Sequence, residues 1–187
     1  ASHVRHHNDT LVVCCKLSNG HIGWGEGLPR PYVTGESIAS VWRHLEQTSF
    51  RSLADEFQDA REASDMFDQF VLASVDAPSG VTPRECFGNA VRCSLEMAIL
   101  DAACQADDQN MGDWIASLPE AAAVIKKRNE VFYSTVITSM TARKQWLSAL
   151  KMKLFGFGQV KVKVGTEGID DRACLRRIRK VIGPHVD

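Results

Sequence analysis

A strictly alternating segment near the C-terminal end constrains the fold of this chain more than any other feature. In residues 159–164, three valines share one face of an expected strand, and Lys161 and Lys163 share the other face. A half-solvated strand has such a pattern, but a strand in a parallel sheet is normally covered on both faces. In a barrel of parallel strands the lysines would point into the interior, near the open end where active sites gather.

The segments around this strand favour a parallel arrangement. A short strand is expected over residues 131–137, a helix over 146–154 that ends at Gly156 or Gly158, and a second helix over 169–182. A strand, helix, strand and helix joined by short loops predict parallel βα units.

Two lysines in such a position suggest proton-transfer chemistry. Desolvation lowers the pKa of a lysine, and so does a second ammonium group about 7 Å away, one pleat repeat along the strand. A lysine that is neutral near pH 7 acts as a general base. The alternative is a solvated edge strand with two surface lysines, and the spacing alone leaves both possibilities open.

The first part of the chain predicts a hairpin and a loop. Residues 10–17 and 22–26 are expected to pair as antiparallel strands, because the Asn19-Gly20 pair favours a type I′ turn. An irregular loop with two prolines follows over residues 28–35.

Helices are expected after this loop, over residues 38–45, around 66–71 and over 82–106. The last of them is predicted to begin at Thr82, with Pro83 at its first position, and to be largely buried. Asp101 lies within it, where a hydrogen-bonded structural carboxylate is favoured over a catalytic one.

Three glycines at residues 23, 25 and 27 resemble a phosphate loop only superficially. Their spacing is wrong and no helix opens directly after them, so glycines at a twisted or bulged strand end are favoured. His3, His6 and His7 are expected to belong to a solvated segment rather than a metal site.

The composition excludes several classes of protein. A net charge of −1, from 22 basic and 23 acidic residues, removes the bulk-charge argument for nucleic acid or an anionic membrane as a partner. No apolar run approaches the ~20 residues of a membrane span. The six cysteines form no Cys-x-x-Cys pair, so reduced cysteines in a cytoplasmic protein are expected.

Four segments taken in order resemble the N-terminal part of an enolase-superfamily enzyme of the muconate lactonizing enzyme/mandelate racemase type. They are residues 23–36, the helical segment 98–103, the strand 132–137, and residues 156–165, which are similar to the family's Lys-x-Lys strand. The resemblance covers nearly the whole chain.

The resemblance implies a fold in two parts. An α+β capping domain of antiparallel hairpin plus helices would occupy residues 1–128. The first two βα units of a modified (β/α)-barrel would occupy residues 129–187, where the barrel is truncated. A closed barrel needs eight strands and typically ~250 residues, so a fragment of a longer enzyme is expected, inactive by itself.

The resemblance also implies roles for individual residues. Lys163 would be the general base that removes the α-proton of a carboxylate substrate, and Lys161 would lower its pKa and stabilise negative charge. Contacts with the substrate are implied for Pro31, Tyr32 and Val33 in the capping loop and for Thr135 at the end of the first barrel strand.

The implied chemistry passes through an enediolate stabilised by Mg²⁺. The family's metal ligands are carboxylates on the third, fourth and fifth barrel strands, so none is expected within this chain. Muconate-type cycloisomerisation is the first expectation, and dipeptide epimerisation, N-acylamino acid racemisation and o-succinylbenzoate synthesis share the same base. A small-molecule carboxylate substrate and a homo-oligomer are expected. The alternative from another class is a non-catalytic α+β interaction module.

Overall fold

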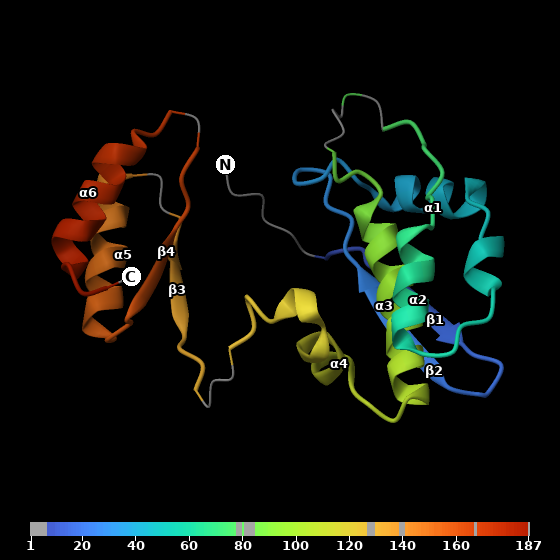
Figure 1. Cartoon of the computed structure of the whole chain (residues 1–187). Helices are drawn as coiled ribbons and strands as arrows, with labels where there is room; N and C mark the ends of the chain where they lie inside the picture. The colour runs from blue at the N-terminus through green and yellow to red at the C-terminus, as the bar shows by residue number, and fades with distance from the viewer. Residues whose placement is uncertain are drawn as a thin grey trace. The chain divides into compact units, whose positions relative to one another are not determined.

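The structure, a computed structural model, describes residues 7–77, 80, 85–126, 130–138, 141–166 and 168–186. The chain divides into two compact units, residues 1–125 and residues 126–187. Figure 1 draws the first in blue to yellow and the second in orange to red.

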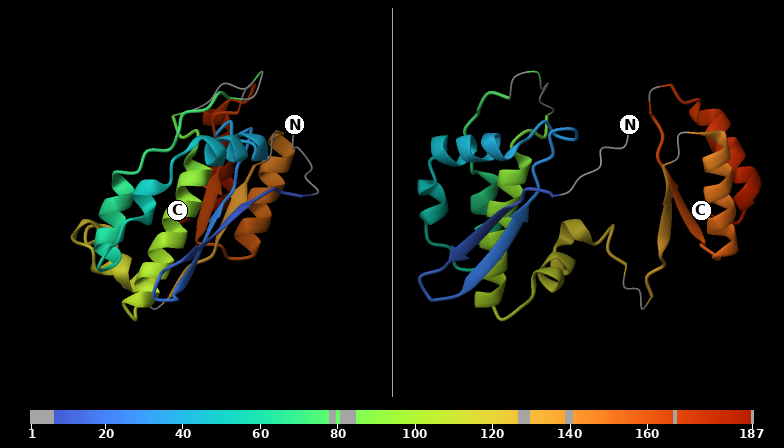
Figure 2. Two further views of the ribbon diagram at one scale, coloured as in Figure 1. Left: turned by 90° about the vertical axis from the view of Figure 1, so that its right-hand side faces the viewer. Right: turned by 180° about the vertical axis from the view of Figure 1, so that it is seen from behind.

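The first unit is built on the predicted hairpin. Strands β1 (Leu11–Lys16) and β2 (Ile22–Gly27) pair antiparallel without a bulge. Gly20, at a φ of 95°, makes the turn between them. Helix α3 (Asn89–Ala106) lies along one face of the hairpin (Figure 2).

Short helices complete this unit. They are α1 (Ile38–Gln47), the 3₁₀ turn η1 (Arg51–Ala54), α2 (Ala60–Asp68), α4 (Met111–Ser117) and the 3₁₀ turn η2 (Pro119–Ala121). Polar side chains cap the α-helices locally: Ser37 begins α1, Asp59 begins α2 and Asn110 begins α4. The main core packs α2 and α4 against α3, with Phe67, Phe70 and Trp114 almost fully buried.

Two helix predictions in this unit need correction. The expected start at Thr82 and Pro83 lies outside the described residues, but Glu85 to Gly88 form a turn and α3 begins only at Asn89. Gly88 has a left-handed φ of 96°, which interrupts a helix. The helix expected around 66–71 ends at Asp68, because the chain turns there to bury a phenylalanine.

The second unit is a parallel βα pair. Strands β3 (Ser134–Ile137) and β4 (Gln159–Val162) pair in parallel, as the strand–helix alternation predicts. Helices α5 (Ala142–Leu154) and α6 (Asp171–Ile182) cover one face of the pair (Figure 1). Helix α5 ends at Leu154, two residues before the predicted stop at Gly156, whose φ is 75°. The first strand is shorter than predicted, since residues 131–133 precede β3 and are exposed.

The helices in the described part of the chain are all too short or too polar to cross a lipid bilayer.

Candidate functional site

Strand β4 holds the two lysines on one face of the parallel pair. The Lys163 amide donates to the Ile137 carbonyl at 3.1 Å, which extends the strand pairing one residue beyond β4. Val160 and Val162 pack against the helices, whereas Lys161 and Lys163 are exposed on the opposite face. The predicted alternation is therefore present, but the enclosed surroundings expected for the lysines are not seen among the described residues.

Thr135 does not share the lysine face. The register pairs Thr135 with Val160 and Ile137 with Val162, so Thr135 is half-buried on the face that the helices cover. The alternation of β3 instead assigns the lysine face to Val136 and, just beyond the strand, to the exposed Thr138. Because the apolar Ile137 marks the buried face, counting in twos from Val136 indicates Thr138, a signal that was present in the sequence and was missed.

The loop before α1 presents three expected contact residues at its tip. The Arg30 carbonyl accepts hydrogen bonds from the amides of Val33 and Thr34, at 2.9 Å each. These two bonds close a tight turn. Pro31, Tyr32 and Val33 are exposed on that turn, with 57% of Tyr32 accessible. They lie in the first unit, and the two lysines lie in the second.

A buried carboxylate fixes the end of this loop. Glu36 follows the loop directly and is only 1% exposed. Its Oε1 accepts hydrogen bonds from the amides of Gly88 at 3.0 Å and Ala90 at 2.9 Å, at the beginning of α3. A carboxylate at a helix N-terminus is favoured by the free amides and by the helix dipole. Glu36 therefore ties the loop to α3, a role that nothing in its local sequence indicates.

The three glycines of β2 have a packing role. A Cβ on Gly23 would lie 2.2 Å from the Ala98 carbonyl oxygen, and one on Gly25 would lie 1.9 Å from that of Ser94. One on Gly27 would lie 1.9 Å from the Ala90 carbonyl oxygen. The backbone of α3 thus rests directly on the strand. The three glycines have a structural role, as predicted. The reason for them is the close approach of α3 and not a bulge in the strand.

Asp101 has the structural role that was favoured. Asp101 lies on α3, the helix that covers the hairpin, and its Oδ2 accepts a hydrogen bond from the Trp24 amide of β2 at 2.8 Å. Within the described ranges no three His, Cys, Asp or Glu side chains come close enough to hold a metal ion. His7 is exposed, and the two earlier histidines lie outside the described residues. All six cysteines are free thiols.

No model of a known protein family matches the sequence, and no curated protein matches it either. Solved structures do match. A mandelate racemase/muconate lactonizing enzyme from Roseiflexus sp. superposes with a TM-score of 0.55 and 23% identity, over 94% of this chain and 44% of that one.

Two epimerases match in the same way. The L-Ala-D/L-Glu epimerase from Bacillus subtilis gives a TM-score of 0.60 and 20% identity, over 95% of this chain and 44% of that one. A dipeptide epimerase from Methylococcus capsulatus, solved with a Mg ion, gives a TM-score of 0.54 and 18% identity, over 96% of this chain and 46% of that one. The chain spans less than half the length of each of these structures, and at such identities the likeness concerns the fold. The chain therefore has a fold that matches slightly less than half of mandelate racemase/muconate lactonizing enzyme and dipeptide epimerase structures.

Proposed function

We propose that this chain is part of an enzyme that removes the α-proton of a small carboxylate substrate. The observation that carries the proposal is the pair Lys161 and Lys163 on one face of β4, whose other face is packed against helices. Two ammonium groups next to each other on one face of a parallel strand contribute nothing to the packing of its other face against the helices. They are expected where an anion must be bound and a proton must be moved.

Lys163 is the proposed base. It lies beyond the last residue of β4, at the carboxyl end of a parallel strand, which is where sites form in parallel αβ proteins. Its Nζ would take the proton from the α-carbon, and Lys161 would bind the carboxylate and stabilise the negative charge. Thr138 on the same face is a further candidate contact, in preference to Thr135.

The first unit is proposed to be the capping domain of this enzyme, and the second unit the start of its barrel. Residues 1–128 would form the capping domain and residues 129–187 the start of a (β/α)-barrel. The parallel pairing of β3 with β4 supports a barrel start. So does an apolar groove beside β4, lined by Val162, Val164 and Leu175, which further βα units would cover. Pro31, Tyr32 and Val33 would then contact the substrate from the capping loop.

The residues described here do not fit a magnesium site, since they bring no three ligands together. No step is therefore assigned to a metal within this chain. The Mg²⁺ expected for such an enzyme would need carboxylates outside the described residues, and the isolated chain is proposed to be inactive.

Muconate-type cycloisomerisation is the first proposed reaction, and dipeptide epimerisation is the second because epimerases are among the matching structures. N-acylamino acid racemisation and o-succinylbenzoate synthesis use the same proton abstraction. The enzyme is proposed to be cytoplasmic and homo-oligomeric.

Exchange of the substrate α-proton in D₂O tests the role of Lys163. The protein that carries this chain is incubated with a muconate lactone or with dipeptides, and deuterium incorporation is followed by NMR. Lys163→Ala should abolish exchange, whereas Lys153→Ala on α5, a matched loss of one exposed lysine, should leave it unchanged. Undiminished exchange in Lys163→Ala would refute the assigned role.

The exposure of both lysines favours one alternative, a non-catalytic interaction module. In that case no substrate would exchange its α-proton, either with the unchanged protein or with the Lys163→Ala variant.

A further inference from the structure

A single histidine in the described part of the chain is buried. His44, on α1, is only 3% exposed. The other described histidines, His7, His21 and His185, are exposed. Histidine is the side chain whose charge ordinarily changes between about pH 5 and 8. A buried histidine makes the structure around it sensitive to pH when one of its two charge states lacks a hydrogen-bond partner.

The two ring nitrogens of His44 have different surroundings. Nδ1 lies 2.8 Å from the carbonyl oxygen of Ala73, which can only accept, so Nδ1 carries the proton of the neutral ring. Nε2 is buried and has no hydrogen-bond partner among the described residues. The neutral ring has no hydrogen on Nε2 and fits this site. The protonated ring gains an N–H there, for which the described structure provides no acceptor.

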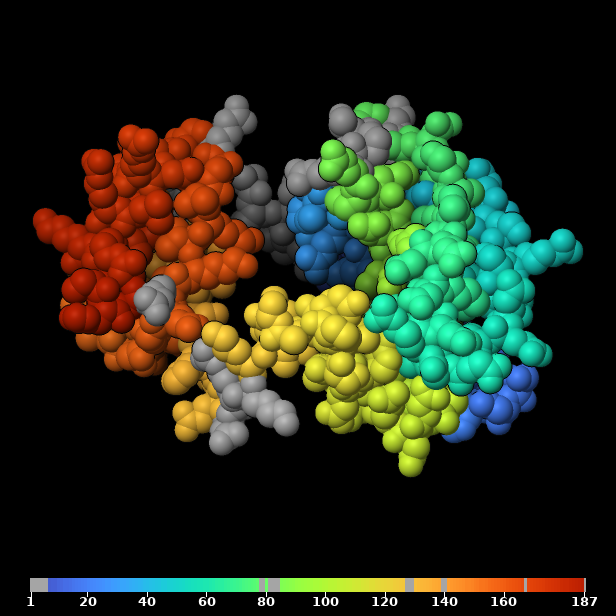
Figure 3. All heavy atoms as spheres, viewed as in Figure 1, coloured from blue at the N-terminus to red at the C-terminus, as the bar shows by residue number. Residues whose placement is uncertain are grey.

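The ring joins two segments that are distant in sequence. In the segment after α2, the Ala73 carbonyl accepts from His44, and the Ala73 amide donates to the Thr48 hydroxyl of α1 at 3.0 Å. Figure 3 shows this segment, in green, against the blue and cyan side chains of α1. In the turn before α3, the Phe87 ring centroid lies 5.4 Å from that of His44, and a Cβ on Gly88 would lie 3.4 Å from Nε2. We call these contacts of the His44 ring the histidine clasp.

Most ionisable groups on the elements next to the clasp cannot serve a protonated Nε2 as a buried acceptor. Three carboxylates on these elements are exposed to water: Glu46 on α1, Asp76 after α2 and Glu85 before α3. Arg43 on α1 and Arg92 on α3 are cations, which repel a protonated ring and accept no hydrogen bond. Cys86 in the turn is a half-buried thiol, which is a weak acceptor.

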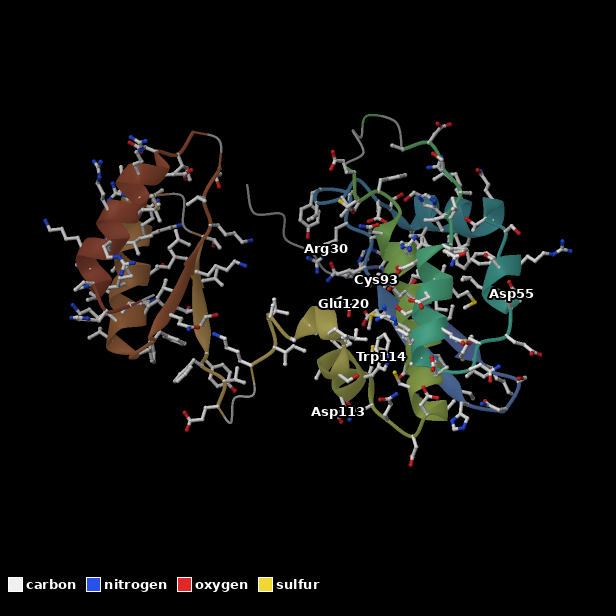
Figure 4. The ribbon with its side chains drawn as sticks, in the orientation of Figure 1. Arg30, Asp55, Cys93, Asp113, Trp114 and Glu120 are labelled. Atoms are coloured by element: carbon white, nitrogen blue, oxygen red, sulfur yellow. The ribbon has the colours of Figure 1, made fainter. Side chains whose placement is uncertain are left out.

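Glu36 is the exception, because its carboxylate also borders Gly88. Its Oε1 accepts the Gly88 amide at 3.0 Å and the Ala90 amide at 2.9 Å. A protonated His44 that turned towards this carboxylate would compete with both amides for it. An unmet N–H and a diverted carboxylate both weaken the beginning of α3 and the end of the loop before α1, in which Figure 4 labels Arg30.

We infer that the histidine clasp is a pH-sensitive device: protonation of His44 releases Ala73 from α1 and loosens the turn and the loop that meet at Gly88. The clasp forms with the neutral ring. It is therefore intact above the range in which histidine takes up a proton and is lost as the pH falls through that range. The inference concerns the first unit by itself and does not depend on the proposed catalysis.

Hydrogen exchange of single amides, followed by NMR on the whole chain, tests the clasp. The Ala73 amide reports its bond to α1, and the amides of Gly88 and Ala90 report the hold of Glu36. After correction for the intrinsic effect of pH on exchange, the protection of these amides should fall at least about tenfold from about pH 7.5 to about pH 5. The Lys163 amide, bonded within the strand pair of the second unit, should keep its protection.

Two substitutions separate His44 from the other histidines. His44→Asn keeps a donor for the Ala73 carbonyl, because the side-chain amide of asparagine occupies the place of Nδ1, and it takes up no proton in this range. Protection in this variant should be the same at both pH values. His21→Asn removes an exposed histidine from the hairpin and should keep the full pH dependence.

The ¹⁵N shifts of the His44 ring give a second measurement that needs no substitution. At about pH 7.5 the proton should be on Nδ1, and the ring should become protonated with the same midpoint at which the three amides lose protection. This measurement decides the matter even if His44→Asn fails to fold.

Four results would overturn the inference. Protection that stays constant on acidification would show that the clasp does not respond to the ring, and protection that rises would show that Glu36 binds the protonated ring as a partner. A pH dependence retained in His44→Asn would assign the response to another group. A ring that becomes protonated more than about one pH unit away from the midpoint of the amides would separate the two events.

Discussion

Replacing Gly25 by alanine tests the contact between β2 and α3. The added Cβ would lie 1.9 Å from the Ser94 carbonyl oxygen and 2.7 Å from the Ala98 amide nitrogen. Ordinary contact begins near 3.4 Å, so the helix must withdraw by about 1.5 Å along this line. Both colliding atoms belong to the backbone, and no change of rotamer can relieve the overlap.

The expected loss of stability is about 2–3 kcal/mol. Forcing an extra carbon into a packed contact costs about 1–3 kcal/mol, and a backbone collision places this case at the upper end. The withdrawal of α3 also lengthens the hydrogen bond from the Trp24 amide to Asp101. Against this, alanine restricts the unfolded chain and returns about 0.4–1 kcal/mol.

Urea unfolding followed by circular dichroism measures the effect. The midpoint should fall by about 1 M for a slope of about 2–3 kcal/mol per M. Gly158→Ala is the matched control, since a Cβ there meets nothing within 4 Å. A Gly25→Ala protein as stable as Gly158→Ala would refute the direct seating of α3 on β2. Ser94→Gly in the same chain should give no rescue, because the obstructing oxygen is not part of a side chain.

Other outcomes follow from the same geometry. Glu36→Ala should cost about 2–4 kcal/mol, because two buried amides lose a charged acceptor, and chymotrypsin should then cleave faster after Tyr32; equal cleavage would show that the loop is held by other contacts. Asp101→Asn should lower stability by about 1 kcal/mol in the urea assay, and a larger loss would indicate an additional role. Burial, reinforced by nearby carboxylates, raises the pKa of the Cys104 thiol. At pH 8, mass spectrometry should therefore find iodoacetamide on the exposed Cys14 and Cys93 long before Cys104; early labelling of Cys104 would contradict its burial.

Local patterns predicted the elements whose causes are local. The Asn19-Gly20 turn, the end of α5 just before Gly156 and the alternation of β4 all depend on residues that are neighbours in sequence, and all three are present. The start of α3 was misplaced because its acceptor comes from Glu36, more than fifty residues earlier.

The candidate site shows the same division. Alternation placed both lysines on one face correctly, but the face of Thr135 depends on where the pairing of β3 begins, which the sequence leaves open. The glycines of β2 were recognised as structural, yet their reason is a helix that lies some seventy residues further along the chain. The two units have opposite net charges, which can be counted from the sequence but nearly cancel in the net charge of the whole chain.

The hydrogen bonds of Glu36 bear on the order in which the first unit assembles. Helix α1 has its own start signal in Ser37 and can form as soon as its residues are available. Helix α3 has no side-chain cap from its own N-cap residue, and the carboxylate that completes it closes a loop of 52 residues. The first turn of α3 should therefore be among the last parts of this unit to become ordered during folding, and the loop of residues 28–35 should become fixed in the same event.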